Sequence, residues 1–125
     1  MPLVLSSKNE LDSAWRKYPD SDVEFLVQPL SGQASENFDK RNMHNEWEKG
    51  NPLPQRNDDY EINRACMIVR DWKNVHDENG KEVKCNEFSI RNLHNHFPRI
   101  ISWALKQENL MQEGDAAIKI EEKKI

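Results

Sequence analysis

Hydrophobic and polar residues alternate near the N-terminus, over Val23 to Gln28. A period of two is typical of a strand with one buried face. The stretch from Tyr18 to Asp22 contains Pro, Asp and Ser, which favour a turn, and Pro29 ends the strand because it has no N–H to donate. With Trp15 to Tyr18 as the second strand, the pattern predicts a small β-hairpin between about residues 11 and 30.

Helical periodicity replaces this alternation in the middle of the chain. After Ser31-Gly32, helix formers continue to about Lys49, with Ala34, Phe38 and Trp47 near one face. Gly and Pro residues then predict a loop over residues 50–59. From Tyr60 to Trp72, apolar residues three or four positions apart form a continuous stripe, which predicts a second helix.

The C-terminal half contains two more helical patterns after a turn. Asn79-Gly80 favours a tight turn, so we expect a short ribbon over residues 75–83. Asn86 is a suitable N-cap for a helix that ends near Phe97, and Pro98 suits the first turn of the next helix. Gly114 is expected to end that helix.

These patterns predict an α+β fold that is mainly α-helical, with about four helices and a small N-terminal β-hairpin element. Residues 1–113 are expected to form a single compact domain, with the β element over about residues 1–30 and the helical part over 31–113. Residues 114–125 are charged and poor in core residues, so we expect a flexible tail or a partner-binding segment.

The charge and hydropathy of the chain limit its partners. Its 22 acidic and 18 basic residues are interspersed and give a net charge of −4, so no basic field favours nucleic acid. No apolar window approaches the length of about 18 residues that a membrane span needs. Pro2 to Leu5 is too short for a signal peptide, and we therefore expect a cytoplasmic protein with no membrane contact. Cys66 and Cys85 are expected to be small apolar residues rather than a disulfide.

Two short motifs carry candidate chemistry. His94-Asn95-His96 spells a nuclease motif, but residues two apart on a helix point in opposite directions, and no further ligands follow. Residues 77–80 resemble part of a calcium loop, yet the first and last ligand positions of such a loop are not matched, which favours a surface turn. Ser31 and Ser35 have no companion base in a recognisable order, and no Gly-rich phosphate loop exists. The sequence therefore predicts no catalytic residue, metal, cofactor or small-molecule substrate.

Four tryptophans are many for a chain of this length. Trp72 and Trp103 lie on apolar faces and are expected to anchor the core. Trp15 and Trp47 have more polar surroundings, where either a core or an interface role is open.

Three segments together resemble a known family. Residues Trp15–Ser31 look like the N-terminal module of bacteriophage tail assembly chaperones, of the kind found in siphophages and prophages. Residues Ile68–Val83 are similar to the order of helix, Asp-Trp, short aliphatic and acidic-Gly turn that recurs in that family. Residues Phe88–Leu105, a capped helix that breaks at Pro98 into another, are similar too.

The resemblance implies a protein without catalysis or cofactor that binds the tape-measure and tail tube proteins during tail assembly in the host cytoplasm. Self-association is expected as well. The helical part would then present an apolar groove to the tape measure, framed by four residues: Trp72, Phe97, Ile101 and Trp103. We expect partner binding at six residues: Trp15, Trp47, Trp72, Phe97, Ile101 and Trp103. The alternatives are an HNH-like metal-dependent nuclease that uses His94 and His96, and a small regulatory protein-binding module.

Overall fold

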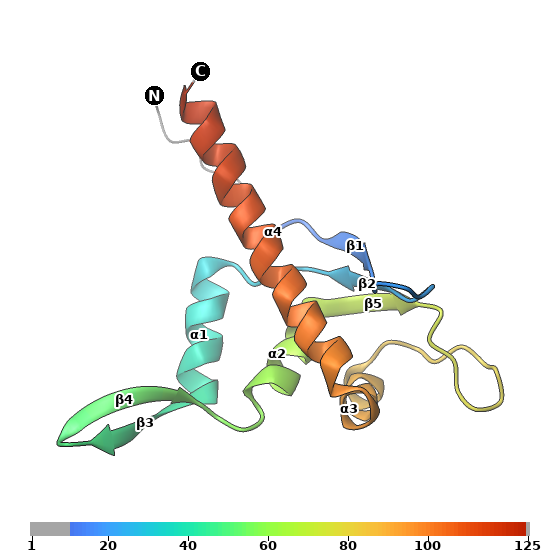
Figure 1. Cartoon of the computed structure of the whole chain (residues 1–125), viewed down its shortest axis with the longest axis horizontal. Helices are drawn as coiled ribbons and strands as arrows, with labels where there is room; N and C mark the ends of the chain where they lie inside the picture. The colour runs from blue at the N-terminus through green and yellow to red at the C-terminus, as the bar shows by residue number, and fades with distance from the viewer. Residues whose placement is uncertain (1–10, 125) are drawn as a thin grey trace.

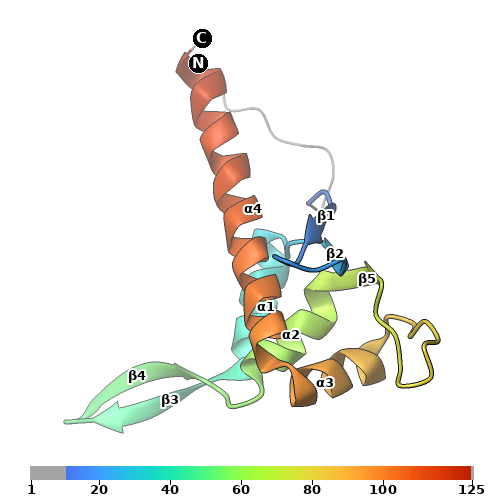
Figure 2. The ribbon, with the colours of Figure 1, turned by 45° about the vertical axis from the view of Figure 1, so that its right-hand side comes forward.

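The structure, a computed structural model, describes the backbone of residues 11–124 and the side chains of residues 11–113. This part of the chain holds four helices and five strands, and the strands form a three-stranded and a two-stranded sheet. The larger sheet and the helices make a central body (Figure 1). A two-stranded hairpin and the end of the last helix project from that body in different directions (Figure 2).

The predicted N-terminal hairpin is confirmed. β1 (Ala14–Lys17) pairs antiparallel with β2 (Glu24–Val27). The Ser21 hydroxyl closes the turn between them, because it accepts from the backbone N–H of Val23 and donates to the carbonyl of Tyr18. The alternation in β2 buries the side chains of Phe25 and Val27 beneath the sheet, as their spacing predicted.

A third strand joins this sheet from a segment that we expected to be helical. The helix predicted to reach Trp72 stops earlier, because α2 spans Tyr60–Ile68 and β5 spans Val69–Lys73. β5 pairs antiparallel with β2, and the register shifts by one residue beside Val69. Such a bulge lets Val69 and Trp72, three positions apart, both be buried from one strand. In the sequence, this spacing of three matches the apolar stripe of a helix, so the strand was predicted to be helical.

A second correction concerns residues 43–56. α1 spans Gly32–Asn42 rather than reaching Lys49, and the segment predicted to be a loop contains a strand. β3 (Met43–Glu48) and β4 (Asn51–Arg56) form an antiparallel hairpin, which we call the arm. Lys49 and Gly50 have φ values of 52° and 81°, the two positive angles of a type I′ turn. Gly50 thus lies in the turn of a β-hairpin and does not end a helix.

The last two helices begin where the sequence predicted. α3 spans Glu87–His96 and starts with a capping box, in which Asn86 and Ser89 bond each other's backbone N–H. α4 spans Pro98–Lys124, so it does not end at Gly114. The side chains of residues 114–125 lie outside the described part, and a flexible or partner-binding role for that segment stays a prediction.

The hydrophobic core lies between the three-stranded sheet and the helices. α4 packs against α2, α3 and β2, and α2 also contacts α1, α3 and β5. Ile68 and Ile101, from α2 and α4, are among the most deeply buried side chains, together with Phe25 of the sheet. Trp103 packs on Tyr18 and Phe25, with ring centroids 5.2 and 5.8 Å apart.

The predicted fold class is wrong in its β part. The α+β arrangement and the four helices are present within residues 11–124, but the strands are not confined to an N-terminal hairpin. Every residue of the arm from His44 to Arg56 is exposed, so the arm has no buried face to produce an alternating pattern. β5 was not predicted as a strand, because its bulge disrupts the alternation with a period of two.

Candidate functional site

A charged pair is buried where α2 and α4 meet. Glu108 is 1% exposed and Arg64 is 8% exposed. Arg64 Nε donates to Glu108 Oε1 at 2.6 Å, and one terminal nitrogen donates to Oε2 at 3.2 Å. This two-point geometry is the strong form of an arginine–carboxylate contact. The pair joins residues 44 positions apart in the sequence.

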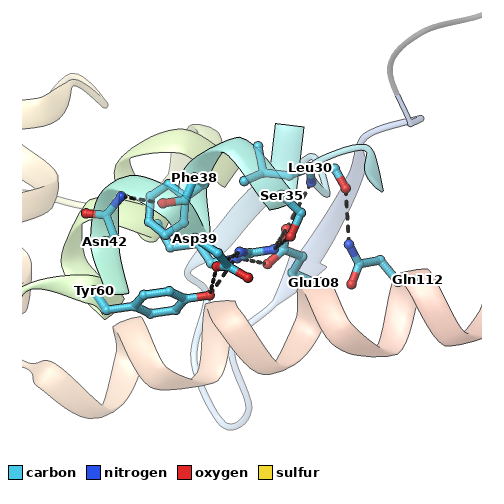
Figure 3. A network of polar contacts seen from close by, with 9 residues as sticks. Leu30, Ser35, Phe38, Asp39, Asn42, Tyr60, Glu108 and Gln112 are labelled. Carbon is cyan, nitrogen blue, oxygen red and sulfur yellow. Dashed lines mark hydrogen bonds and ion pairs between the residues drawn. The ribbon is translucent and has the colours of Figure 1, made fainter. Parts of the chain in front are cut away.

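Further side chains extend this pair into a polar network, which we define as Ser35, Asp39, Tyr60, Arg64 and Glu108. Arg64 Nη2, the nitrogen that donates to Glu108 Oε2, also donates to Ser35 Oγ at 3.0 Å, and Nη1 donates to the Tyr60 hydroxyl at 3.1 Å. Tyr60 in turn donates to Asp39 at 2.7 Å. Figure 3 shows these contacts lying between α1 and α4.

The polar network also holds the segment between β2 and α1. The backbone N–H of Leu30 donates to Glu108 Oε2 at 2.9 Å, and the Gln112 side chain donates to the Leu30 carbonyl at 3.1 Å (Figure 3). Burial alone lowers the pKa of Arg64, but its bonds to Glu108 outweigh this and raise the pKa above the ordinary value. Because each of the three guanidinium nitrogens of Arg64 has an acceptor, we interpret the polar network as a structural clamp.

The ribbon over residues 75–83 lies beside the sheet, fixed by Trp72. The Trp72 indole N–H donates to the Val83 carbonyl at 2.6 Å, and the Val83 N–H donates to the Val75 carbonyl at 2.8 Å. At the tip, an Asp77 carboxylate oxygen accepts from the N–H groups of Asn79 and Lys81. Asp77 therefore stabilises a turn, in agreement with the surface-turn interpretation of this motif.

An open hollow of about 450 Å³ lies between the ribbon and α3, and we call it the groove. Its apolar lining comes from Trp72, Val75, Val83, Leu93 and Phe97. Phe97 is 58% exposed, so a large apolar surface faces solvent at one end. The ribbon adds Asp77 and Glu78, while α3 adds polar residues such as Asn92 and His96.

The structure brings only two of the four predicted groove residues together. Trp72 and Phe97 line the groove. Ile101 is 1% exposed in the core, and Trp103 lines a different hollow beside Arg99 and Lys106. The sequence missed Val75, Val83 and Leu93, because the ribbon that carries the two valines has no regular pattern.

The other two predicted residues lie on separate surfaces. Trp15 is 38% exposed on β1, and the Lys73 ammonium lies 4.1 Å from the centre of its ring. Trp47 is 72% exposed on the arm. Their roles in partner binding stay predictions.

The candidate nuclease motif lies at the end of α3. His94 is half-buried, and His96 is exposed at the last position of the helix. Among the described residues, no group of three or more His, Cys, Asp or Glu side chains is arranged to hold a metal ion.

Both cysteines are free thiols. Burial raises the pKa of the Cys66 thiol and raises that of Cys85 to about 11, so both are protonated at neutral pH. They act as partly buried packing residues beside the core.

Comparisons with protein families, with curated proteins and with solved structures find no match for this chain. Within residues 11–124, no helix has the length and apolar character needed to cross a bilayer.

Proposed function

We propose that this protein is a tail assembly chaperone that binds the tape-measure and tail tube proteins of a phage in the host cytoplasm, without catalysing a reaction. The resemblance of residues 15–31, 68–83 and 88–105 to that family supports the phage assignment. The groove supports the binding role and is the observation that carries the proposal.

The groove has the chemistry of a helix-binding surface. Its floor is aromatic and aliphatic, and exposed Phe97 forms one end. Covering a large apolar side chain contributes about 1.5–3 kcal/mol to binding. When an amphipathic partner helix places one or two apolar side chains in the groove, apolar surface is covered on both the helix and the groove. Both covered surfaces then contribute to the binding energy.

The acidic ribbon adds a preference for charge. Asp77 and Glu78 lie on one side of the groove, and Glu82 follows on the same ribbon. A basic residue beside the apolar anchors of the bound helix would meet these carboxylates and orient it. The proposed ligand is therefore a tape-measure segment with apolar anchors and flanking Lys or Arg.

Co-expression with the tape-measure and tail tube proteins encoded beside its gene tests this function. The full chain carries an affinity tag, and the complex is isolated by pull-down and size exclusion. A stable complex is the expected result. A gene without such neighbours, or a chain that captures neither protein, overturns the proposal.

A pair of phenylalanine variants tests the groove itself. Phe97→Asp places a charge at the end of the groove and is expected to weaken binding by about tenfold or more, as for an anchor residue. Phe88 is 81% exposed on α3 and does not line the groove, so Phe88→Asp is the matched control. Equal binding by both variants would place the partner surface elsewhere.

A further inference from the structure

The arm has two chemically different faces. The register places Trp47 opposite Pro52, Asn45 opposite Pro54 and Met43 opposite Arg56, so these six side chains share one face. The other face carries His44, Glu46, Glu48, Asn51, Leu53 and Gln55. With Trp47 72% exposed, an aromatic and proline-rich surface is open to solvent.

The hydrogen-bond pattern of the arm follows from one bond at its base. Asn57 N–H donates to the Asn42 carbonyl at 2.9 Å. Bonded and non-bonded pairs alternate along an antiparallel ladder, so the pairs at His44, Glu46 and Glu48 bond across the arm. The N–H and carbonyl groups of Asn45 and Trp47 therefore point outward, away from β4.

The outer edges of β3 and β4 differ in whether a further strand can pair with them. The outward positions of β4 include Pro52 and Pro54, which have no N–H, so this edge is blocked against a further strand. β3 has no proline. Within the described residues β3 pairs only with β4, and its outer edge keeps both donors and acceptors.

We propose that two copies of this chain pair through the outer edges of β3, antiparallel about a two-fold axis at Asn45, to form one four-stranded sheet. In this register each Asn45 faces its equivalent, and Met43 faces Trp47 of the second copy. His44 faces Glu46 of the second copy on the opposite face of the sheet. An isologous contact of this kind is self-complementary, as a closed dimer requires.

Charge favours the register centred on Asn45 over the neighbouring registers of the same strand pair. Centring the axis on Glu46 would place two glutamates opposite each other. Centring it on Trp47 would place Glu46 against Glu48, and like charges directly opposite destabilise a strand pair. Centring it on His44 would oppose two histidines and leave Trp47 without a strand opposite. The Glu46 register also pairs His44 with Glu48, but only the Asn45 register gives opposite-charge pairs without a like-charge pair and keeps both Met43–Trp47 pairs.

A second copy fits this edge better than an open series of strands. The dimer would have the order β4-β3-β3-β4, and both of its outer edges would then be the proline-blocked β4. Assembly therefore stops at two copies instead of growing into a fibre. An isolated two-stranded hairpin is marginally stable in water, and a four-stranded sheet with one largely apolar face overcomes this weakness.

The oligomeric state of the full chain tests the proposal, measured by sedimentation over a range of concentrations. We expect a dimer for the wild type and for Asn45→Ala, which keeps the edge N–H. Asn45→Pro removes two inter-copy bonds and should raise the dimer dissociation constant about tenfold or more. A monomeric wild type overturns the proposal, and so does an Asn45→Pro variant that dimerises as the wild type does.

A charge exchange checks the register. His44→Glu places Glu opposite Glu46 of the second copy and should weaken the dimer. The double variant His44→Glu, Glu46→His restores opposite charges across the axis and should recover it. A double variant that stays as weak as the single one overturns the Asn45 register.

A cross-link gives a readout that does not depend on affinity. Bonded antiparallel pairs have Cα atoms about 5.5 Å apart, which a disulfide can bridge. Oxidised Asn45→Cys should therefore form a covalent dimer, whereas Gln55→Cys, on β4, should not. Equal cross-linking by both variants overturns the proposal. Because Phe97→Asp leaves the arm intact, loss of the dimer and loss of tape-measure binding are separate results.

Discussion

The polar network and the arm both carry charged and aromatic side chains, but they are built in opposite ways. In the network, Glu108 and Arg64 are almost completely buried and join α1, α2 and α4. In the arm, every residue from His44 to Arg56 is exposed, and the strands pair only with each other among the described residues. Polar groups in the first region fix the fold, whereas those in the second are available to another molecule.

The energetic consequences differ accordingly. A buried ion pair adds little net stability over a well-packed apolar pair, yet removing one partner is costly because the other charge stays buried. Exposed pairs contribute little in either case. Substitutions in the network should therefore change the stability of the whole chain, and substitutions in the arm should change local order or association.

The largest effect is expected for Glu108→Ala. The variant leaves Arg64 charged and buried and removes the acceptor of the Leu30 N–H, so unfolding should become easier by about 3–5 kcal/mol. Glu113→Ala, at an exposed position of the same helix, is the control and should change stability by less than about 0.5 kcal/mol. Urea unfolding compares them. Similar stabilities would contradict the clamp interpretation.

An intermediate effect is expected where α3 begins beside the groove. Asn86→Ala removes the capping side chain that accepts from the Ser89 N–H, which should cost about 1 kcal/mol. Asn95→Ala makes the same exchange inside α3, where alanine favours the helix, and should be neutral or stabilising. Thermal unfolding distinguishes the two variants. An equal loss of stability in both would argue against the cap.

The sequence predicted elements where local pattern and burial agree. β2 alternates because one face is buried, and α3 and α4 begin at Asn86 and Pro98, whose preferences are local. β5 was not predictable in this way, since its bulge gave Val69 and Trp72 a helical spacing. The arm was missed because exposed strands need no alternation, and because Gly50 suits both the end of a helix and a type I′ turn.

The candidate sites were less predictable than the fold. Arg64 and Glu108 lie on otherwise apolar faces, four residues after Tyr60 and four after Ala104, so their positions were a signal that could have indicated a buried pair. That these two residues pair with each other could not be predicted from the sequence, because they lie on distant segments. The groove was only half predicted, since Trp72 reaches it from β5 and the ribbon supplies the opposite wall.

An effect confined to the arm is expected for Gly50→Ala at its tip. A Cβ at Gly50 would meet no atom within 4 Å, so the cost comes only from its φ of 81°. For alanine this left-handed angle costs about 1 kcal/mol. Amide exchange in the arm should accelerate about fivefold, while global unfolding stays unchanged. Gly32→Ala, which also has open space but no positive φ, should show neither change. Loss of global stability in Gly50→Ala would show that the arm and the body unfold together.

The smallest effect concerns His44, whose ring lies within hydrogen-bonding distance of Asn57 and of Glu46. The hydrogen bond to Asn57, followed by that to Glu46, raises the pKa of His44 above 6.5. Because the pKa is raised in the folded arm, the stabilising contribution of the charged ring is complete below pH 6.5 and is lost as the pH rises through the higher value.

An NMR titration of the ring should therefore give a midpoint above 6.5, and Asn57→Ala should lower that midpoint. Sedimentation of the wild type over the same pH range should show the dimer weakening as His44 loses its charge, since its pairing with Glu46 of the second copy depends on that charge. A midpoint at or below 6.5 would mean that the side-chain contacts of the arm do not persist in solution.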